Sequence, residues 1–303
     1  MGFLKRRLRF SCRIPTVALF VVLAPAVSRA QTTSDGSDSA FTEVPELKEG
    51  FRLLYVQKYP EAREKFSAWT AEHPADPFGF DAEAASYLFE EFYRQGVMTS
   101  EFFMDDKKFL RGIEGKPDPE RMKNFGAELA QTRKLAGGRL SKDRHDAAAL
   151  FALTLAAGME SNADSILEKK HVDGLKRMKE ANEHAKLLLA QRPDANDAWV
   201  APGSADYIIG CLSGGVRMVL WFGGIHGDKK LGMELVERTA EKGRYLEPFA
   251  KVLLALAARR EKKDALAKKL LHELTEEFPD SPLFAAEYAK VMGRPIPAEM
   301  KPN

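Results

Sequence analysis

Residues 267–279 read Ala-Lys-Lys-Leu-Leu-His-Glu-Leu-Thr-Glu-Glu-Phe-Pro, and the pattern in this stretch decides the fold of the chain. Ala267 is followed by Leu271 and Leu274, and Pro279 closes the stretch. Spacings of four and three place the first three side chains on one face of an α-helix, whereas proline cannot continue a helix. The stretch therefore predicts a helix that packs along one face, and the point at which that helix ends.

The same spacing occurs three times in the chain. The three copies are Ala62, Phe66, Trp69 and Pro74; Ala181, Ala185, Leu188 and Pro193; and Ala267, Leu271, Leu274 and Pro279. We call this four-residue pattern the repeated phrase. It is typical of the second helix of a tetratricopeptide-type hairpin, whose repeat is about 34 residues long. The closing prolines lie 119 and 86 residues apart, and neither interval is a whole multiple of that length. The sequence therefore predicts degenerate repeats with insertions.

The rest of the chain predicts an all-α protein. Apolar residues recur at spacings of three and four from Glu46 onward, and alternating β-branched runs are almost missing. We expect a tetratricopeptide-like α-solenoid of stacked antiparallel helical hairpins over residues 45–293, followed by a C-terminal tail over 294–303. The expected helices are 46–57, 61–72, 81–95, 100–110, 119–136, 143–158, 162–191, 228–241, 245–260, 264–278 and 283–292.

Several helix ends can be assigned to particular residues. Asp81 and Asp228 are predicted N-caps, because a carboxylate can accept from the first free N–H groups of a helix. The pair Gly137-Gly138 is expected to end the helix that begins at Pro119. Residues 162–191 contain no proline, which predicts one long helix or two that are nearly coaxial.

The N-terminus has the layout of a secretory signal peptide. Residues 1–13 carry five bases and no acid, the apolar run 14–27 follows, and Ser28 and Ala30 are small residues at a cleavage site. The apolar run is shorter than the roughly 20 residues that span a bilayer, which argues against an uncleaved anchor. We predict cleavage after Ala30, export to the periplasm, and a disordered linker over residues 31–44.

Removal of this segment changes the net charge of the chain. Residues 1–30 hold six of the 46 Lys and Arg residues and none of the 44 Asp and Glu residues, so the remainder carries 40 bases against 44 acids and a formal net charge of −4. An acidic domain has no general attraction to phosphate, so we expect no nucleic-acid partner. One cysteine, Cys211, remains after position 30, so no internal disulfide is expected there.

Three short motifs resemble catalytic or binding motifs but lack essential residues. Glu276 stands where a zinc-protease helix starting at His272 needs its second histidine. The turn Gly227-Asp228-Lys229-Lys230 lacks the Ser or Thr of a phosphate-binding loop. The glycines around Cys211 and Ser213 have the wrong interval for a nucleophile elbow. We therefore predict no catalytic, cofactor-binding or metal-binding residue, and no cofactor.

Residues 207–225 form a long apolar segment that allows three interpretations: a buried helix pair, the lining of a ligand cavity, or a membrane contact. Arg217 near its centre and its several glycines favour a buried or kinked helix pair over a membrane contact. Cys211 is then expected to be a small buried residue. Trp199, Trp221, Phe222 and the aromatic residues between 78 and 109 are expected in the core or as anchors for a partner.

A resemblance to a known family rests on residues in the C-terminal half of the chain. These are the segment Gly223 to Gly232, the triplets Gly243-Arg244-Tyr245 and Pro282-Leu283-Phe284, and the phrase over 267–279. Over residues 145–292 the chain resembles exported bacterial tetratricopeptide-repeat proteins of no assigned activity. It is more distantly similar to the eukaryotic tetratricopeptide family that contains the yeast inclusion-body clearance protein. The resemblance implies a helical-repeat fold and a scaffold role, and implies no catalytic residue.

These observations predict a non-catalytic scaffold of the cell envelope that binds a protein or a peptide in the groove of a helical repeat stack. One alternative is an envelope assembly or transport component that holds a lipid or small ligand in an apolar cavity lined by residues 207–225. Another is a hydrolase built on helical hairpins, which would need several polar residues converging in one pocket.

Overall fold

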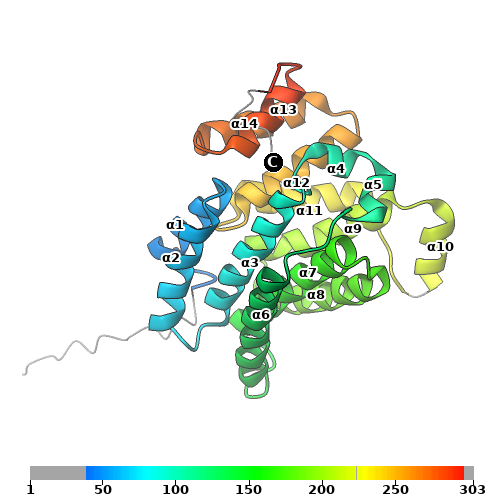
Figure 1. Cartoon of the computed structure of the whole chain (residues 1–303). Coiled ribbons are helices and arrows are strands. Elements are labelled where there is room, and N and C mark those ends of the chain that lie inside the picture. The colour runs from blue at the N-terminus through cyan, green and yellow to red at the C-terminus, as the bar shows by residue number, and fades with distance from the viewer. Residues whose placement is uncertain (1–38, 223, 297–303) are drawn as a thin grey trace, which may run out of the picture. The chain divides into compact units, whose positions relative to one another are not determined.

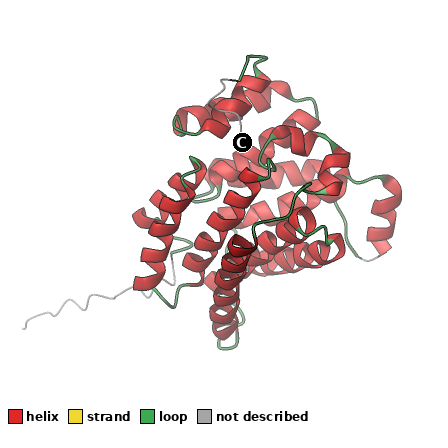
Figure 2. Cartoon of the chain, viewed as in Figure 1, coloured by secondary structure: helices red, strands yellow, loops and turns green. Residues whose placement is uncertain are grey.

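The computed structural model describes residues 39–222 and 224–296. Contacts divide the chain into two units, Met1–Thr33 and Ser34–Asn303, and every described residue belongs to the second. The predicted signal peptide lies outside the described residues. Within them the regular elements are all helices, and Figure 2 shows no strand in the coloured part of the chain. The all-α prediction is confirmed.

Fourteen α-helices and two shorter helical turns make up the part of the chain that the structure describes. The α-helices are α1 (Pro45–Tyr55), α2 (Tyr59–Glu72), α3 (Pro77–Arg94), α4 (Ser100–Met104), α5 (Asp106–Arg111), α6 (Pro119–Leu140), α7 (Ala147–Asn162), α8 (His171–Gln191), α9 (Val200–Cys211), α10 (Gly214–Phe222), α11 (Lys229–Lys242), α12 (Glu247–Arg260), α13 (Asp264–Glu277) and α14 (Pro282–Val291). A π-helical turn, η1 (Ala163–Leu167), follows α7, and a 3₁₀ turn, η2 (Asn196–Trp199), precedes α9.

Most long helices pack against the next long helix in the chain, as in α1–α2–α3, α6–α7–α8 and α11–α12–α13–α14 (Figure 1). The residues of the repeated phrase form the buried face, because all nine positions before the prolines are buried. They are Ala62, Phe66, Trp69, Ala181, Ala185, Leu188, Ala267, Leu271 and Leu274. The packing within the first hairpin is close, since a Cβ atom on Gly50 would lie 2.4 Å from the Phe66 ring. The repeated phrase therefore marks packed helix faces.

The first hairpin also packs against the last ones. The Tyr55 hydroxyl donates to the Tyr245 carbonyl at 2.8 Å, and the Ser281 hydroxyl donates to the Tyr55 carbonyl at 3.0 Å. The rings of Tyr55 and Phe278 meet edge to face at 5.6 Å. In an open solenoid each repeat contacts only its neighbours. In this chain, one core contains residues from both the N-terminal and C-terminal hairpins.

Residues 39–44 differ from the linker expected over 31–44, because they pack on this core. Ala40 is buried, and the Ser39 hydroxyl donates to Asp76 Oδ2 at 2.6 Å. The backbone N–H of Val44 donates to the Tyr245 hydroxyl at 3.1 Å. Composition indicated a polar segment but could not show these partners, which lie far away in the sequence.

Two predicted helix ends are wrong. Asp81 is not a cap but a buried residue inside α3, which begins at Pro77 because Asp76 accepts from the Phe78 N–H at 3.0 Å. The pair Gly137-Gly138 does not end α6, which continues to Leu140. Packing of α6 against α3 and α7 outweighs the low helix propensity of glycine.

Two other segments are divided where one helix or two coaxial helices were expected. Asp105 accepts from the N–H groups of Lys107 and Lys108, which starts α5 and separates it from α4. The stretch 162–191 breaks before α8, where Lys169 has a positive φ of 58°. The predicted helices over 228–241, 245–260, 264–278 and 283–292 are found within two residues of the expected bounds.

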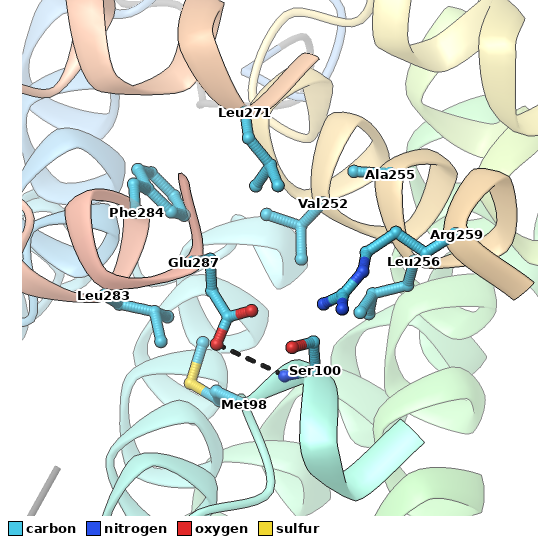
Figure 3. Close-up of a pocket in the computed structure, with 10 residues that line it drawn as sticks. All are labelled: Met98, Ser100, Val252, Ala255, Leu256, Arg259, Leu271, Leu283, Phe284 and Glu287. Carbon is cyan, nitrogen blue, oxygen red and sulfur yellow. Dashed lines mark hydrogen bonds between the residues drawn. The ribbon is translucent and has the colours of Figure 1, made fainter. Parts of the chain in front are cut away.

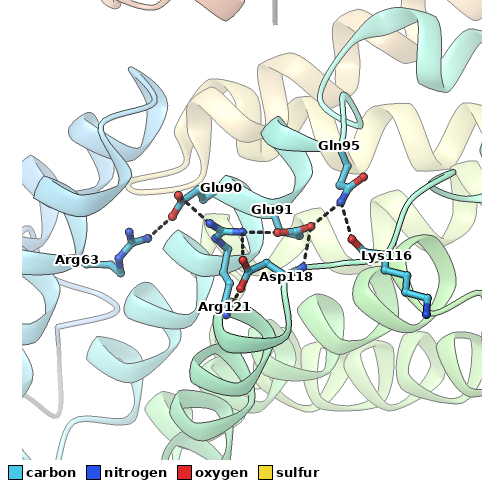
Figure 4. A network of polar contacts seen from close by, with 7 residues as sticks. All are labelled: Arg63, Glu90, Glu91, Gln95, Lys116, Asp118 and Arg121. Carbon is cyan, nitrogen blue, oxygen red and sulfur yellow. Dashed lines mark hydrogen bonds and ion pairs between the residues drawn. The ribbon is translucent and has the colours of Figure 1, made fainter. Parts of the chain in front are cut away.

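A polar network joins α2, α3 and α6 (Figure 4). Arg121 on α6 donates to the buried Glu91 at 2.5 Å and to Glu90 at 3.2 Å, and Arg63 on α2 donates to Glu90 at 2.7 Å. Glu91 also accepts from the Gln95 side chain at 2.8 Å. The charge of Glu91 is thus compensated by an arginine and further hydrogen bonds, as a buried carboxylate requires.

Candidate interaction surface

Helix α10 is an apolar helix that stands apart from the other helices, at the end of two connecting segments (Figure 1, yellow-green). None of its nine residues is buried. Its exposed fractions are 47% for Val216, 60% for Met218, 68% for Val219, 58% for Trp221 and 78% for Phe222. In the described residues, these are five of the ten large apolar side chains that are exposed. Exposed apolar residues are therefore concentrated on this helix.

The base of α10 is a tight crossing of α9 and α11, and glycines allow the two helices to approach. A Cβ atom on Gly232 would lie 2.5 Å from the Tyr207 nitrogen and 2.7 Å from the Gly203 oxygen. A Cβ atom on Gly227 would lie 2.6 Å from the Gly210 nitrogen. Real Cβ atoms do not approach backbone atoms this closely, so these positions need glycine. We call the set Gly203, Gly210, Gly227 and Gly232 the glycine neck.

Both ends of α10 are closed by hydrogen bonds. At its start, the Arg217 N–H donates to the Ser213 carbonyl at 2.9 Å, and the Arg217 guanidinium donates to the Gly210 carbonyl at 3.3 Å. At its end, Gly224 has a φ of 74°, its N–H donates to the Trp221 carbonyl at 2.9 Å, and the Ile225 N–H donates to the Leu220 carbonyl at 3.0 Å. These two bonds are those of a Schellman motif, which pairs the Leu220 and Trp221 carbonyls near the end of the helix.

The chain returns to α11 through a charged turn. Asp228 Oδ1 accepts from the N–H groups of Lys230 and Leu231 at 2.8 and 3.1 Å, which confirms the predicted cap. Lys229 pairs with Glu261 at 2.9 Å, and this hydrogen bond raises the pKa of Lys229. The side chain of Lys230 is 89% exposed. This side of the neck therefore carries charges of both signs, of which Lys230 is the most exposed.

The buried helix pair expected over residues 207–225 is found only in part. Ile209 and Gly210 in α9 are buried, whereas α10 is exposed, and Cys211 between them is half-buried. The apolar run is long enough for two helices, but α9 alone packs against α11. The sequence favoured burial of this helix, since residues 216–222 are apolar at every position except Arg217 and offer no polar face to solvent.

The sequence did not show which aromatic residues are buried and which are exposed, and the structure separates the two groups. Phe78, Phe92 and Phe102 are buried in the core. Trp199 is half-buried, with the Arg238 guanidinium 4.3 Å from the centre of its ring. The exposed ring of Trp221 contacts those of Phe222 and His226, with centroids 5.3 and 6.3 Å apart. The anchor role that the sequence allowed for several aromatics therefore fits Trp221 and Phe222 best.

The other motifs singled out from the sequence lie elsewhere and are not joined into a site. His272 and Glu276 lie 3.4 Å apart on the exposed face of α13. No group of three or more metal-ligating side chains occurs in residues 39–222 and 224–296. Gly227 and Asp228 serve the neck and the helix cap described above.

Two cavities in the described chain lie away from residues 207–225 and are small. One of about 20 Å³ lies between α12, α13, α14 and the start of α4, where Arg259, Ser100 and Glu287 face one another among apolar residues (Figure 3). Glu287 accepts from the Ser100 N–H at 3.2 Å. The other, of about 30 Å³, lies beside Asp197. Volumes of this size hold about one water molecule each.

Buried carboxyl groups occur at the interface of α3 with α6 and α7. Asp81 is buried, and neither of its carboxyl oxygens has a hydrogen-bond partner in the described chain. Burial raises the pKa of Asp81 well above its ordinary value. Burial, together with the nearby Glu128, raises the pKa of Glu83 to about 7. The stability of this interface should therefore depend on pH.

No family model, curated protein or solved structure matches this chain. No helix within the described ranges has both the length and the apolar character needed to cross a membrane.

Proposed function

We propose that this chain is a non-catalytic scaffold of the cell envelope that attaches to a partner through α10. The single observation that supports this is a nine-residue apolar helix without one buried residue, on a base that glycines hold together. Folded proteins rarely expose contiguous apolar surface without a use for it, and such patches mark interaction sites. The helical body then serves to present α10 and to carry further contacts.

The expected binding groove of a tetratricopeptide-type stack remains part of this proposal. Support comes from the buried repeat phrases and from the packing of consecutive helices. The contacts between the first and last hairpins restrict such a groove, because they join the ends of the stack into one core. We therefore assign the principal contact to α10 and a secondary one to the stacked helices.

The location in the envelope is proposed from the N-terminal sequence. The basic residues, the apolar run and the small residues at Ser28 and Ala30 support export and cleavage after Ala30. N-terminal sequencing of the exported protein tests this part, and a start at position 31 is the expected result.

The attachment role can be tested by photo-cross-linking in the cells that export the protein. A photoreactive phenylalanine analogue is placed at position 222, and a matched control carries it at position 187 on α8, where Leu187 is also an exposed apolar residue. We expect position 222 to form discrete adducts, of lipid or of protein, at a much higher yield than position 187. Equal yields at the two positions, or none at either, would show that α10 is not an attachment element.

A further inference from the structure

We infer that α10 inserts into one leaflet of a phospholipid bilayer that carries anionic lipids, and so holds the protein on the membrane surface without crossing it. This inference rests on the proposed function, in which α10 is the element of attachment. It goes further because it names the partner. Four features of the described residues carry it: the distribution of apolar side chains around α10, the length of the helix, the charge near it, and its rigid base.

The apolar side chains surround α10 instead of forming one stripe. A helix turns by about 100° per residue, so Val216, Met218, Val219, Trp221 and Phe222 point in directions that leave no gap wider than about 140°. That gap holds the half-buried Leu220 and the guanidinium of Arg217, which turns back to the Gly210 carbonyl. A protein groove covers one face of a helix, typically through anchors at i, i+3, i+4 and i+7. A bilayer covers the whole circumference.

The helix has the length of a one-sided insertion. Nine residues at about 1.5 Å per residue give a helix of roughly 14 Å, against a hydrocarbon thickness of about 30 Å. Such a helix can enter one leaflet but cannot reach the other. The bonds at Gly224 and Ile225 pair the Trp221 and Leu220 carbonyls, which reduces the number of unpaired backbone groups that would enter the bilayer. Trp221 lies on the last turn, and tryptophan favours the interfacial region of a bilayer.

A highly exposed base, Lys230, lies near α10, where it can contact an anionic headgroup. Residues 207–230 contain three bases, Arg217, Lys229 and Lys230, and one acid, Asp228, although residues 31–303 as a whole carry an excess of acids. Lys229 is paired with Glu261, and Lys230 lies 3.7 Å from Glu234 while remaining highly exposed. Basic residues next to an inserted segment attract anionic headgroups. Both lysines therefore have acidic partners, and the highly exposed Lys230 is the base that an anionic headgroup can contact most directly.

The glycine neck holds α10 in a fixed place on the body. Gly210 and Gly227 lie in close contact before and after α10. The segment that carries α10 therefore begins and ends at the same place on the helical body. A loop held in this way can enter a membrane while α9 and α11 stay packed. Binding to a bilayer then requires no rearrangement of the body.

The inference is tested with a fluorescent reporter whose emission rises in an apolar environment. The full chain carries Cys12→Ser and Cys211→Ser, and the reporter is attached through Phe222→Cys or, as the matched control, through Leu187→Cys. Because the reporter detects its own surroundings, residues 14–27 can bind lipid without producing a signal at position 222. The probes are vesicles of phosphatidylethanolamine and phosphatidylglycerol at 3:1, and vesicles of phosphatidylcholine alone.

We expect emission from position 222 to rise several-fold on the anionic vesicles and to be quenched by brominated acyl chains, while position 187 changes little. Lys230→Glu should weaken binding to the anionic vesicles about fivefold or more, because each base near such a surface contributes favourably. A reporter at position 222 that stays in water on both vesicle types overturns the inference. If the cross-linker at position 222 then still captures a protein or a second copy of this chain, the proposed function stands without the membrane. If neither experiment gives a signal, both fail.

Discussion

Replacing Gly232 with alanine should destabilise the protein, because this residue sits where α11 crosses α9. The added Cβ atom would lie 2.5 Å from the Tyr207 nitrogen, 2.7 Å from the Gly203 oxygen and 2.8 Å from the Tyr207 Cα. All three are backbone atoms, so no side chain can rotate away to make room. The two helices must therefore separate, and the contact between Gly203 and Val236 is lost with them.

The size of the effect follows from two opposing terms. Overpacking of a well-packed contact costs about 1–3 kcal/mol, whereas alanine in place of glycine inside a helix contributes about 0.5–1 kcal/mol of stability. We expect Gly232→Ala to lower the free energy of unfolding by about 2 kcal/mol, since the clash involves several backbone atoms. For a domain of this size that corresponds to a fall in Tm of about 4–8 °C.

The matched control is Gly126→Ala on α6, an exposed helix position where an added Cβ meets no atom within 4 Å. Only the helix-propensity term applies there, so we expect Tm to rise by about 2 °C. Thermal unfolding followed by circular dichroism measures both variants. If Gly232→Ala were as stable as Gly126→Ala, the close approach of α9 and α11 would be refuted.

Two further substitutions test buried acids. The pKa of Glu83 is raised to about 7 from its ordinary value of 4.5. Between these pH values the folded protein therefore binds more protons than the unfolded one. As a result, the free energy of unfolding falls by about 3 kcal/mol as the pH rises from 4.5 to 7. Glu83→Gln should remove most of this fall in urea titrations at pH 5 and pH 8, and identical pH profiles would contradict the assignment. Asp197 accepts three backbone N–H groups at the start of α12, at 2.8, 3.2 and 3.1 Å, so Asp197→Ala should cost about 3 kcal/mol in the same titrations. A loss below about 1 kcal/mol would show that water replaces the carboxylate.

The sequence was sufficient to predict the packed helix faces, because spacings of three and four depend only on local geometry. Leu188 and Leu274 are fully buried, as their phrases predict. Asp228 was also predictable as a cap, since its partners are two and three residues away. Predictions failed where a distant partner decides the outcome. The linker expected over 31–44 is an example, because the Val44 N–H donates to the hydroxyl of Tyr245, 201 residues further along the chain.

The candidate site was predictable in position but not in exposure. The apolar segment over 207–225 was identified as unusual, and a buried or kinked helix pair was favoured among three interpretations, whereas α10 is exposed. Periodicity shows which residues favour burial, but it does not show whether the fold offers a surface to cover them. Packing of α9 against α11 leaves none for Trp221 and Phe222.

Hydrogen exchange of the full chain, with and without anionic vesicles, tests the role of α10 most directly. An isolated helix of nine residues is marginally stable, so the amides of 214–222 should exchange much faster than those of α11 when no partner is present. On vesicles of phosphatidylethanolamine and phosphatidylglycerol, the account predicts strong protection of 214–222 and no change in α11. Protection of 214–222 already in the free protein, with no further change on vesicles, would contradict it.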